Sequence, residues 1–243
     1  MKYQSIQAMF SETAARYRDN TAIIYQDQQY SYGELEDRAN TIANYLIDNG
    51  AQKGALVGIL AKDSFHFISS IIGILKAGCV FVPFDRQLPQ RRLAAMVSLV
   101  APEWFIIESR FWNILSNVTV DAAPKATVLC VDGEAVTNGE QHLAQAVDYK
   151  NYFNPERPSR ESDADDMAYI YFTSGSTGQP KAIAGRLQGI DHFIKWELET
   201  LGVGEGVRVS RLLPISFDAS LRDIFLPLCS GGAAIGPAPR DTV

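Results

Sequence analysis

Hydrophobic positions along this chain follow two periods, and together they predict alternating helices and strands. Helices are predicted where apolar residues recur every three or four positions: residues 4–18, 32–49, 65–76, 89–99, 189–201 and 221–228. Strands are predicted where short apolar or alternating runs are bounded by turn residues: residues 22–25, 29–31, 55–60, 79–82, 104–107, 126–131, 169–172, 207–213 and 233–235. Ser31, followed three residues later by Glu34, is the pattern of a capping box at the start of the second helix.

The order of these elements indicates an α/β fold. Residues 55–60 and 79–82 are almost continuously apolar, which is typical of strands covered on both faces, and a helix is predicted between them. Strand, helix and strand at this spacing form a crossover unit, so we expect layered, mostly parallel sheets flanked by helices. We expect the strand at residues 233–235 to leave an unpaired sheet edge, with a hazard of self-association.

The periodic pattern decays between residues 132 and 166, where turn residues and acidic residues dominate. This segment is the best candidate for a boundary inside the chain. We therefore expect a first α/β subdomain over residues 1–160 and the start of a second one over residues 161–243.

A loop of small residues follows the predicted strand at residues 169–172. It carries four hydroxyl groups and two glycines before a lysine: Thr173, Ser174, Gly175, Ser176, Thr177, Gly178 and Lys181. Glycines permit turns that aim backbone N–H groups into one concavity, and hydroxyls and the lysine add donors, so the composition favours a bound phosphate. The spacing excludes a Walker-type loop, which needs lysine directly after the second glycine. A polar hairpin or a flexible surface loop is the alternative on composition alone.

The sequence YFTSGSTGQPK, which ends at Lys181, resembles the signature loop of the adenylate-forming superfamily. That superfamily includes the adenylation domains of nonribosomal peptide synthetases, acyl-CoA synthetases and luciferases. The resemblance implies ATP as cosubstrate, with this loop holding the β- and γ-phosphates while a carboxylate attacks the α-phosphate. It extends over residues 10–236, and residues 30–40 and 75–85 resemble two further motifs of the family. Arg86 stands where the second of these motifs has proline, which we interpret as a minor loop difference.

Asp218 stands at a strand-to-helix joint, between Phe217 and Ala219. One interpretation is helix capping, since aspartate at a helix start accepts hydrogen bonds from unpaired backbone N–H groups. The sequence FDAS, followed by an apolar helix and two glycines, also resembles a motif of amino-acid adenylation domains. In that motif the aspartate pairs with the α-ammonium of the substrate, which favours an α-amino acid over a fatty or aryl acid.

The same resemblance extends to the residues around Asp218. It places Phe217 in the substrate site, and Ala219 and Arg222 where the family has residues that select the substrate side chain. An arginine is unusual there. Arg222 is expected either to enter the pocket, where it would suit an acidic or strongly polar substrate, or to be solvated, or to pair with Asp223 or Glu199.

Composition and charge exclude several classes of protein. Hydrophobic residues make up 47% and charged residues 21% of the chain, and the net charge is −6, which indicates neither a nucleic-acid-binding surface nor a polybasic membrane anchor. Three cysteines and three histidines are scattered without disulfide or metal-ligand spacing. The N-terminus lacks a secretory signal and no apolar run is long enough for a membrane span, so we expect a cytoplasmic protein.

The resemblance implies amino-acid activation, in which an amino acid and ATP give aminoacyl-AMP and pyrophosphate before transfer to a carrier-protein thiol. The family's Mg²⁺ ligand, its catalytic lysine and its small C-terminal lid domain are expected outside these 243 residues. We therefore assign no complete catalytic set and no metal ligand, and expect weak or no activity alone. The expected partners are the C-terminal half and a peptidyl carrier protein. Two alternatives stay open: an acyl- or aryl-CoA ligase, against which Asp218 argues, and a non-catalytic module that binds a nucleotide or a partner.

Overall fold

The computed structural model describes residues 3–119, 123, 125–133, 145–148, 152–174 and 179–237. The strands of this part of the chain form two sheets. The larger sheet has the spatial order β7 (Gln145–Asp148), β6 (Thr127–Cys130), β5 (Trp104–Ile107), β3 (Leu56–Leu60), β4 (Val80–Pro83), β8 (Met167–Ser174) and β9 (Pro180–Arg186). The smaller sheet has the order β10 (Arg208–Ser210), β11 (Ala233–Ile235), β1 (Thr21–Tyr25) and β2 (Gln28–Ser31).

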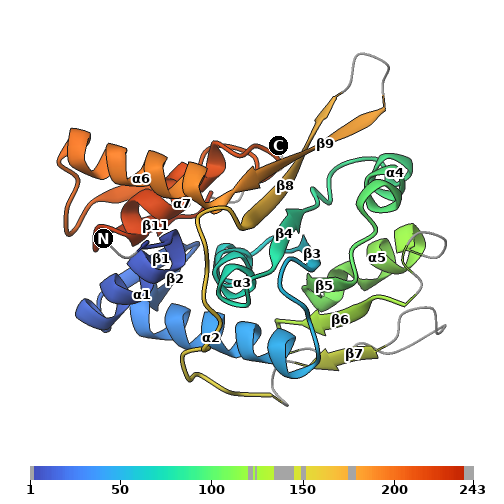
Figure 1. Ribbon diagram of the computed structural model, residues 1–243, viewed down its shortest axis with the longest axis horizontal. Coiled ribbons are helices and arrows are strands. Elements are labelled where there is room, and N and C mark those ends of the chain that lie inside the picture. The colour runs from blue at the N-terminus through green and yellow to red at the C-terminus, as the bar shows by residue number, and fades with distance from the viewer. Residues whose placement is uncertain are drawn as a thin grey trace.

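The helices cover the sheets in layers (Figure 1). They are α1 (Ile6–Arg16), α2 (Tyr32–Asp48), α3 (Ser64–Lys76), α4 (Gln90–Val100), α5 (Trp112–Thr119), α6 (Leu187–Leu201) and α7 (Ser220–Leu228), with a 3₁₀ turn at Ser109–Phe111. In the larger sheet every neighbouring pair is parallel except β8 and β9. The expected α/β class is confirmed.

Alternate residues of the central strands point into two separate cores. Phe81 and Ile106 pack with α2 and α3 on one face of the larger sheet. Val82 and Phe105 pack with α4 and α5 on the other face. Because both faces are covered, these strands are apolar at every position, which is the reason for their continuous hydrophobic runs.

Local sequence signals set the starts of α2 and α3 and allow these two helices to pack closely. The predicted capping box is present, since the Glu34 backbone N–H donates to Ser31 Oγ at 3.1 Å and the Ser31 N–H donates to Glu34 Oε2 at 2.7 Å. Asp63 caps α3 by accepting from the Phe65 N–H at 2.7 Å. At Gly73 an added Cβ would lie 2.8 Å from the Ala39 carbonyl oxygen, so glycine lets α3 approach α2 closely.

The expectation that residues 233–235 leave an unpaired edge is wrong. β11 lies between β10 and β1 and is parallel to both, with Ala234 paired to Val209 on one side and to Ile23 on the other. The parallel partner on each side comes from a distant part of the chain, so local sequence around residues 233–235 does not reveal it.

Two strands lie where the sequence predicts none. β7 falls in the segment 132–166, for which only turn and linker structure is expected, and β9 follows the predicted loop directly. The β9 side chains are mostly exposed, so this strand has no hydrophobic signal of its own and exists through its pairing with β8. The division into subdomains at residue 160 stays a prediction.

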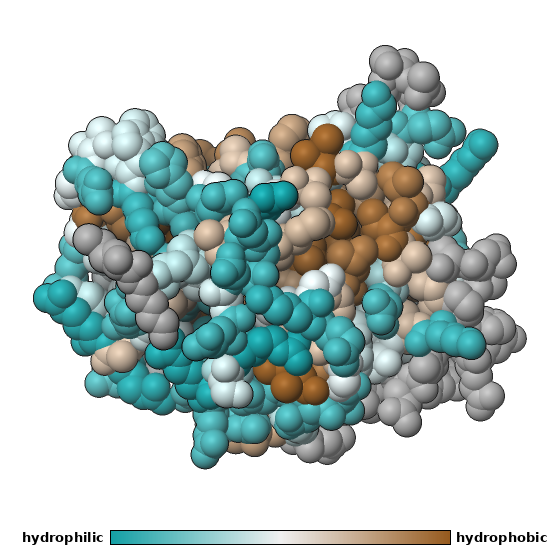
Figure 2. Space-filling model, viewed as in Figure 1, coloured by the Kyte–Doolittle hydropathy of each residue, from teal (hydrophilic) through white to brown (hydrophobic). Residues whose placement is uncertain are grey.

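Apolar side chains gather on one face of the molecule between α4 and the β8–β9 hairpin (Figure 2). Leu99 on α4 and Ile183 on β9 are about half exposed, at 52% and 51%. Within the described residues, no helix has the length and apolar character needed to cross a membrane.

Candidate functional site

The described residues of the predicted phosphate loop lie on β8 and β9, which pair at one edge of the larger sheet (Figure 1). Thr173 is paired with Lys181 across the hairpin. Directly opposed residues share a face of the sheet, so the Thr173 hydroxyl and the Lys181 ammonium lie on the same side, and both residues are exposed. Ser174 is described only as the last residue of β8. The other four predicted loop residues lie outside the described part of the chain: Gly175, Ser176, Thr177 and Gly178.

Asp218 lies near the same face of β8. Burial is the main cause of the raised pKa values of Tyr169 and Tyr171, and the Asp218 charge raises both further. Residues two apart in a strand point to the same side, so Thr173 follows Tyr169 and Tyr171 on this face, about 7 Å beyond Tyr171. The Asp218 charge therefore acts on the two tyrosines that share this face of β8 with Thr173.

Short turns between β10 and α7 present Asp218 to solvent. The Phe217 N–H donates to the Pro214 carbonyl at 3.1 Å, and the Leu221 N–H donates to the Asp218 carbonyl at 2.9 Å. Helix capping by the Asp218 side chain is not observed, because Ala219 occupies the N-cap position and no side chain caps α7. No described residue hydrogen-bonds the Asp218 carboxylate, so this exposed anion is available for a cationic group.

Phe217 and Ala219 flank Asp218 on this turn. Phe217 is 59% exposed, and Ala219 is also exposed. Both side chains can contact a ligand that reaches Asp218. Their roles in binding and selecting a substrate stay predictions.

Arg222 is held by a partner that the sequence does not suggest. Its Nε lies 2.7 and 2.8 Å from the two carboxylate oxygens of Glu197 on α6, and its Nη1 lies 3.8 Å from Asp223 Oδ1. The pairing is therefore with Glu197 and more weakly with Asp223, and not with Glu199. Two carboxylates already neutralise this guanidinium, which weakens the argument for an acidic substrate side chain at Arg222.

The sequence does not predict a buried polar cluster near the start of α7, which comprises Ser64, Tyr171, Arg211 and Ser220. Arg211 is 6% exposed, donates from Nη1 to Ser64 Oγ at 2.9 Å, and lies 5.4 Å from the centre of the Phe67 ring. Burial lowers the pKa of Arg211 to about 10. Arg211 Nε, the Tyr171 hydroxyl and Ser220 Oγ are buried without a hydrogen-bond partner in the described structure. The available signal was an arginine directly before the apolar pair Leu212 and Leu213.

The described residues contain no metal-binding group. No set of three or more His, Cys, Asp or Glu side chains among them is arranged to hold an ion. Cys79 is buried, and burial raises the pKa of its thiol to about 11. A thiol of such high pKa is mostly protonated at neutral pH and is a poor nucleophile.

Together, the fold and the site define a class of protein: an α/β protein with a candidate phosphate-binding hairpin and a free carboxylate beside one strand of its parallel sheet. A family model described as AMP-binding enzyme matches residues 10–242. This match spans nearly the whole chain, and the protein belongs to the AMP-binding enzyme family. The family expected from the sequence is confirmed.

The chain is similar to parts of long synthetases. It is 30% identical to tyrocidine synthase 1 of Brevibacillus parabrevis over 230 residues, which are 95% of this chain and 20% of that protein. It is 29% identical to bacitracin synthase 1 of Bacillus licheniformis over 241 residues, 99% of this chain and 4% of that protein. The chain thus spans a fifth or less of the length of these curated relatives.

Solved structures share the fold. An AMPPNP-bound form of the nonribosomal peptide synthetase FmoA3 superposes with a TM-score of 0.82 at 24% identity, over 99% of this chain and 23% of that one. The N-terminal subdomain of NpsA from Klebsiella oxytoca gives a TM-score of 0.74 at 23% identity, over 98% of this chain and 56% of that one. At these identities the likeness establishes the architecture and leaves individual side-chain roles to the site itself.

Proposed function

We propose that this chain supplies the ATP- and amino-acid-binding part of an amino-acid-activating enzyme of nonribosomal peptide synthesis. In the proposed reaction a carboxylate oxygen of the amino acid attacks the α-phosphorus of ATP. The bond between that phosphorus and the leaving pyrophosphate breaks, which gives aminoacyl-AMP and pyrophosphate. A carrier-protein thiol then takes the aminoacyl group and releases AMP.

The observation that carries this proposal is the free carboxylate of Asp218 beside the face of β8 that leads to the loop. In this proposal Asp218 holds the ammonium group of the amino acid and leaves its carboxylate free to react. The hairpin with Thr173 and Lys181 offers donors for the phosphate oxygens of ATP. A carboxylic acid without an ammonium would leave Asp218 unpaired, which disfavours the acyl- or aryl-CoA ligase alternative.

The described hairpin residues Thr173 and Lys181 would supply donors for phosphate oxygens but form only part of a catalytic site. Lys181 supplies one positive charge, whereas phosphoryl transfer needs further charge neutralisation, which Mg²⁺ supplies in many such enzymes. The described residues hold no metal-binding group. We propose that the Mg²⁺ ligands, the C-terminal half of the adenylation domain and the carrier protein are supplied from outside these residues.

The test is amino-acid-dependent exchange of pyrophosphate into ATP, measured with each of the twenty amino acids. The chain is assayed alone and together with a separately produced C-terminal half of an adenylation domain, with Mg²⁺ present. We expect exchange with one or a few amino acids in the mixture and little or none with the chain alone. Aryl acids without an ammonium are included as a matched comparison.

Exchange with aryl acids but not with amino acids would overturn the substrate assignment. ATP binding without exchange in every mixture would favour the non-catalytic alternative. Exchange that depends on one amino acid would also name the substrate.

A further inference from the structure

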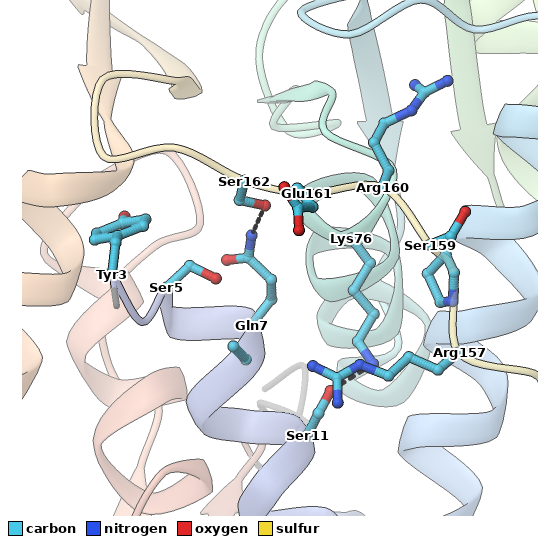
Figure 3. A pocket seen from close by; sticks show the side chains of 12 residues that line it. Tyr3, Ser5, Gln7, Ser11, Lys76, Arg157, Ser159, Arg160, Glu161 and Ser162 are labelled. Atoms are coloured by element: carbon cyan, nitrogen blue, oxygen red, sulfur yellow. Dashed lines mark hydrogen bonds between the residues drawn. The ribbon is translucent and has the colours of Figure 1, made fainter. Parts of the chain in front are cut away.

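A pocket of about 320 Å³ lies between the start of α1, the end of α3 and the extended segment 157–162 (Figure 3). Neither the β8–β9 hairpin nor the start of α7 contributes to its lining. The proposed activation reaction therefore does not use it. Its volume is at the lower end of the range for small-molecule sites in proteins.

The pocket is basic and rich in hydroxyl groups, although the whole chain carries a net charge of −6. Three basic side chains and one acidic side chain line it: Lys76, Arg157, Arg160 and Glu161. Hydroxyl groups come from Ser5 and Ser11 on the α1 side, among others. A basic pocket in an acidic protein favours an anionic ligand over a neutral one.

Two of the three cations already donate hydrogen bonds to the protein, Lys76 through all of its N–H groups and Arg160 through one guanidinium nitrogen. Lys76 Nζ donates to Ser11 Oγ at 2.8 Å, to Glu36 Oε2 at 2.6 Å and to Asn40 Oδ1 at 2.7 Å, which uses all three of its N–H groups. Arg160 Nη1 donates to the carbonyl groups of Ala51 and Ala77 at 2.9 and 2.8 Å.

Arg157 is the cation that remains available. It is exposed, and it makes no hydrogen bond or ion pair with any described residue. Figure 3 shows its guanidinium beside the Lys76 ammonium and Ser11. Burial lowers the pKa of Lys76, Glu36 opposes this shift, and the Arg157 charge adds to it. The positive charges of Lys76 and Arg157 repel each other, and an anion bound at Arg157 reduces that repulsion.

Gln7 provides an independent indication of a ligand. Its residue is only 4% exposed, and its Nε2 donates to Ser162 Oγ at 2.7 Å across the pocket. Its Oε1 atom is buried and has no hydrogen-bond partner in the described part of the chain. An unpaired buried acceptor is unfavourable, so this wall of the pocket favours a ligand that carries a donor such as a hydroxyl group.

We propose that this pocket binds a small hydroxylated phosphate ester, with the phosphate at Arg157 and a ligand hydroxyl donating to Gln7 Oε1. Arginine suits a phosphate because its planar fork donates two parallel hydrogen bonds. Ser11 lies beside Arg157 and adds a hydroxyl for a further phosphate oxygen. The site is separate from the proposed amino-acid and ATP site, so either proposal stands or falls without the other.

The experiment is isothermal titration of this chain with glycerol 3-phosphate, which carries both required groups. Arg157→Gln removes the free cation, and Arg91→Gln on α4 makes the same change at another exposed arginine outside the pocket. We expect Arg157→Gln to weaken binding about tenfold or more, and Arg91→Gln to change it less than about twofold. Gln7→Glu places a negative charge near the phosphate ester at nearly constant side-chain volume. Because the two negative charges repel each other, we expect this variant also to bind about tenfold more weakly or worse. Thermal unfolding shows that each variant is folded.

Two further ligands test the contacts at Arg157 and Gln7 separately. Glycerate has a carboxylate in place of the phosphate group, and inorganic phosphate lacks the glycerol hydroxyl groups. Both are expected to bind more weakly than glycerol 3-phosphate. No saturable binding by the unaltered chain up to about 10 mM ligand, or equal losses in the two arginine variants, would overturn the proposal. Equal affinity for glycerate would overturn the assignment of a phosphate. ATP binding is measured in the same variants and is expected to stay unchanged in Arg157→Gln.

Discussion

Asp218, which we propose binds the substrate ammonium, is a side chain that the fold does not use for helix capping. Aspartate at a helix start usually caps the helix, yet α7 begins at an alanine N-cap and the Asp218 carboxylate has no partner among the described residues. The same chemistry that makes aspartate a good cap makes it a good partner for an ammonium group. This exposed carboxylate is therefore free to bind an ammonium group of a ligand.

Replacing Asp218 with alanine is expected to abolish most amino-acid-dependent pyrophosphate exchange, by about 100-fold or more, because a charge-assisted contact to the substrate is lost. ATP affinity is expected to stay nearly unchanged. Asp27→Ala in the exposed β1–β2 turn is the matched control and should change neither quantity. Equal loss of exchange and of ATP affinity in Asp218→Ala would contradict the assigned role.

The hydroxyl groups of the hairpin loop are tested by converting Thr173 and Thr177 to valine together. Valine keeps nearly the same volume but removes a hydrogen-bond donor at each position, so ATP affinity is expected to fall about tenfold. Binding is measured by titration with a fluorescent ATP analogue. Thr200→Val, at an exposed position of α6, is the control. Unchanged nucleotide affinity in the double variant would leave the loop as an ordinary surface hairpin.

Glu108 gives the protein a specific acid sensitivity. Burial alone would raise the pKa of this carboxyl, but contacts with His66 and Arg110 and hydrogen bonds from the Lys62 and Asp63 N–H groups lower it to about 2, from an ordinary 4.5. The folded-state value lies below the unfolded one, so Glu108 stabilises the fold above pH 4.5. This contribution is lost as the pH falls from about 4.5 towards 2.

Glu108→Gln is expected to lower the free energy of unfolding at pH 7 by about 1–3 kcal/mol, since an amide replaces a hydrogen-bonded anion. The difference from the unaltered chain should shrink between pH 5 and pH 3, as protonation removes the advantage of the carboxylate. Urea unfolding at several pH values measures this. A difference that does not depend on pH would show that the Glu108 charge is not the cause.

At the scale of elements, an ion pair joins α6 to α7. Glu197 is 7% exposed and binds Arg222 through both carboxylate oxygens, and the contact fixes the helix that starts beside Asp218. The pair is half-buried, because the Arg222 side chain is 38% exposed. Its strength is therefore expected to lie between that of a surface pair and that of a fully buried one.

A double-mutant cycle with Glu197→Gln and Arg222→Met is expected to give a coupling energy of about 1–2 kcal/mol in unfolding experiments. Arg222→Met is also expected to leave the preferred amino acid in the exchange assay unchanged, because the guanidinium is occupied by Glu197. A change in the preferred amino acid would contradict this expectation and would indicate that Arg222 lines the substrate pocket.

The sequence predicts well those elements whose own residues bear the pattern. The described helices other than α5, which the sequence analysis does not predict, and the buried strands of the larger sheet have apolar positions at the period of their structure. The capping box at Ser31 is fully local. β9 has no such pattern, because its side chains are exposed and its position comes from pairing with β8.

The candidate site divides in the same way. The loop residues stand out in the sequence because small and hydroxylated residues interrupt an apolar run, whereas the substrate role of Asp218 is implied by the resemblance of its motif to that of amino-acid adenylation domains. The Glu197 partner of Arg222 and the cluster around Arg211 depend on how distant elements pack, which residue spacing does not contain. Tyr171 looks like an ordinary strand residue until its hydroxyl is found buried without a partner.

At the scale of the whole molecule, the smaller sheet is assembled from both ends of the described chain. Ala234 is fully buried in β11, with strands on both sides. Tyr32 at the start of α2 donates its hydroxyl to the Gly232 carbonyl at 2.8 Å, which ties the same two regions together. The stability of the N-terminal region is therefore linked to residues near position 234.

Ala234→Glu is expected to destabilise the protein by about 3 kcal/mol or more, because a carboxylate is forced into a packed strand without a partner. Ala182→Glu makes the same change in the exposed edge strand β9 and is expected to cost less than about 1 kcal/mol. Urea unfolding at neutral pH compares the two variants. Similar losses in both would mean that β11 does not hold the central position in solution.

The place of β11 also bears on how the protein is made. During synthesis, Ile23 leaves the ribosome more than 200 residues before its partner Ala234. The β1–β2 hairpin alone is too small to be stable in water, so β1 becomes stable only after β11 has been synthesised and has paired with it. At ribosomal speeds that interval is roughly 10 to 40 s. During this time the apolar side chains of β1 lack their neighbouring strand, and exposed apolar surface of this kind favours aggregation of the nascent chain.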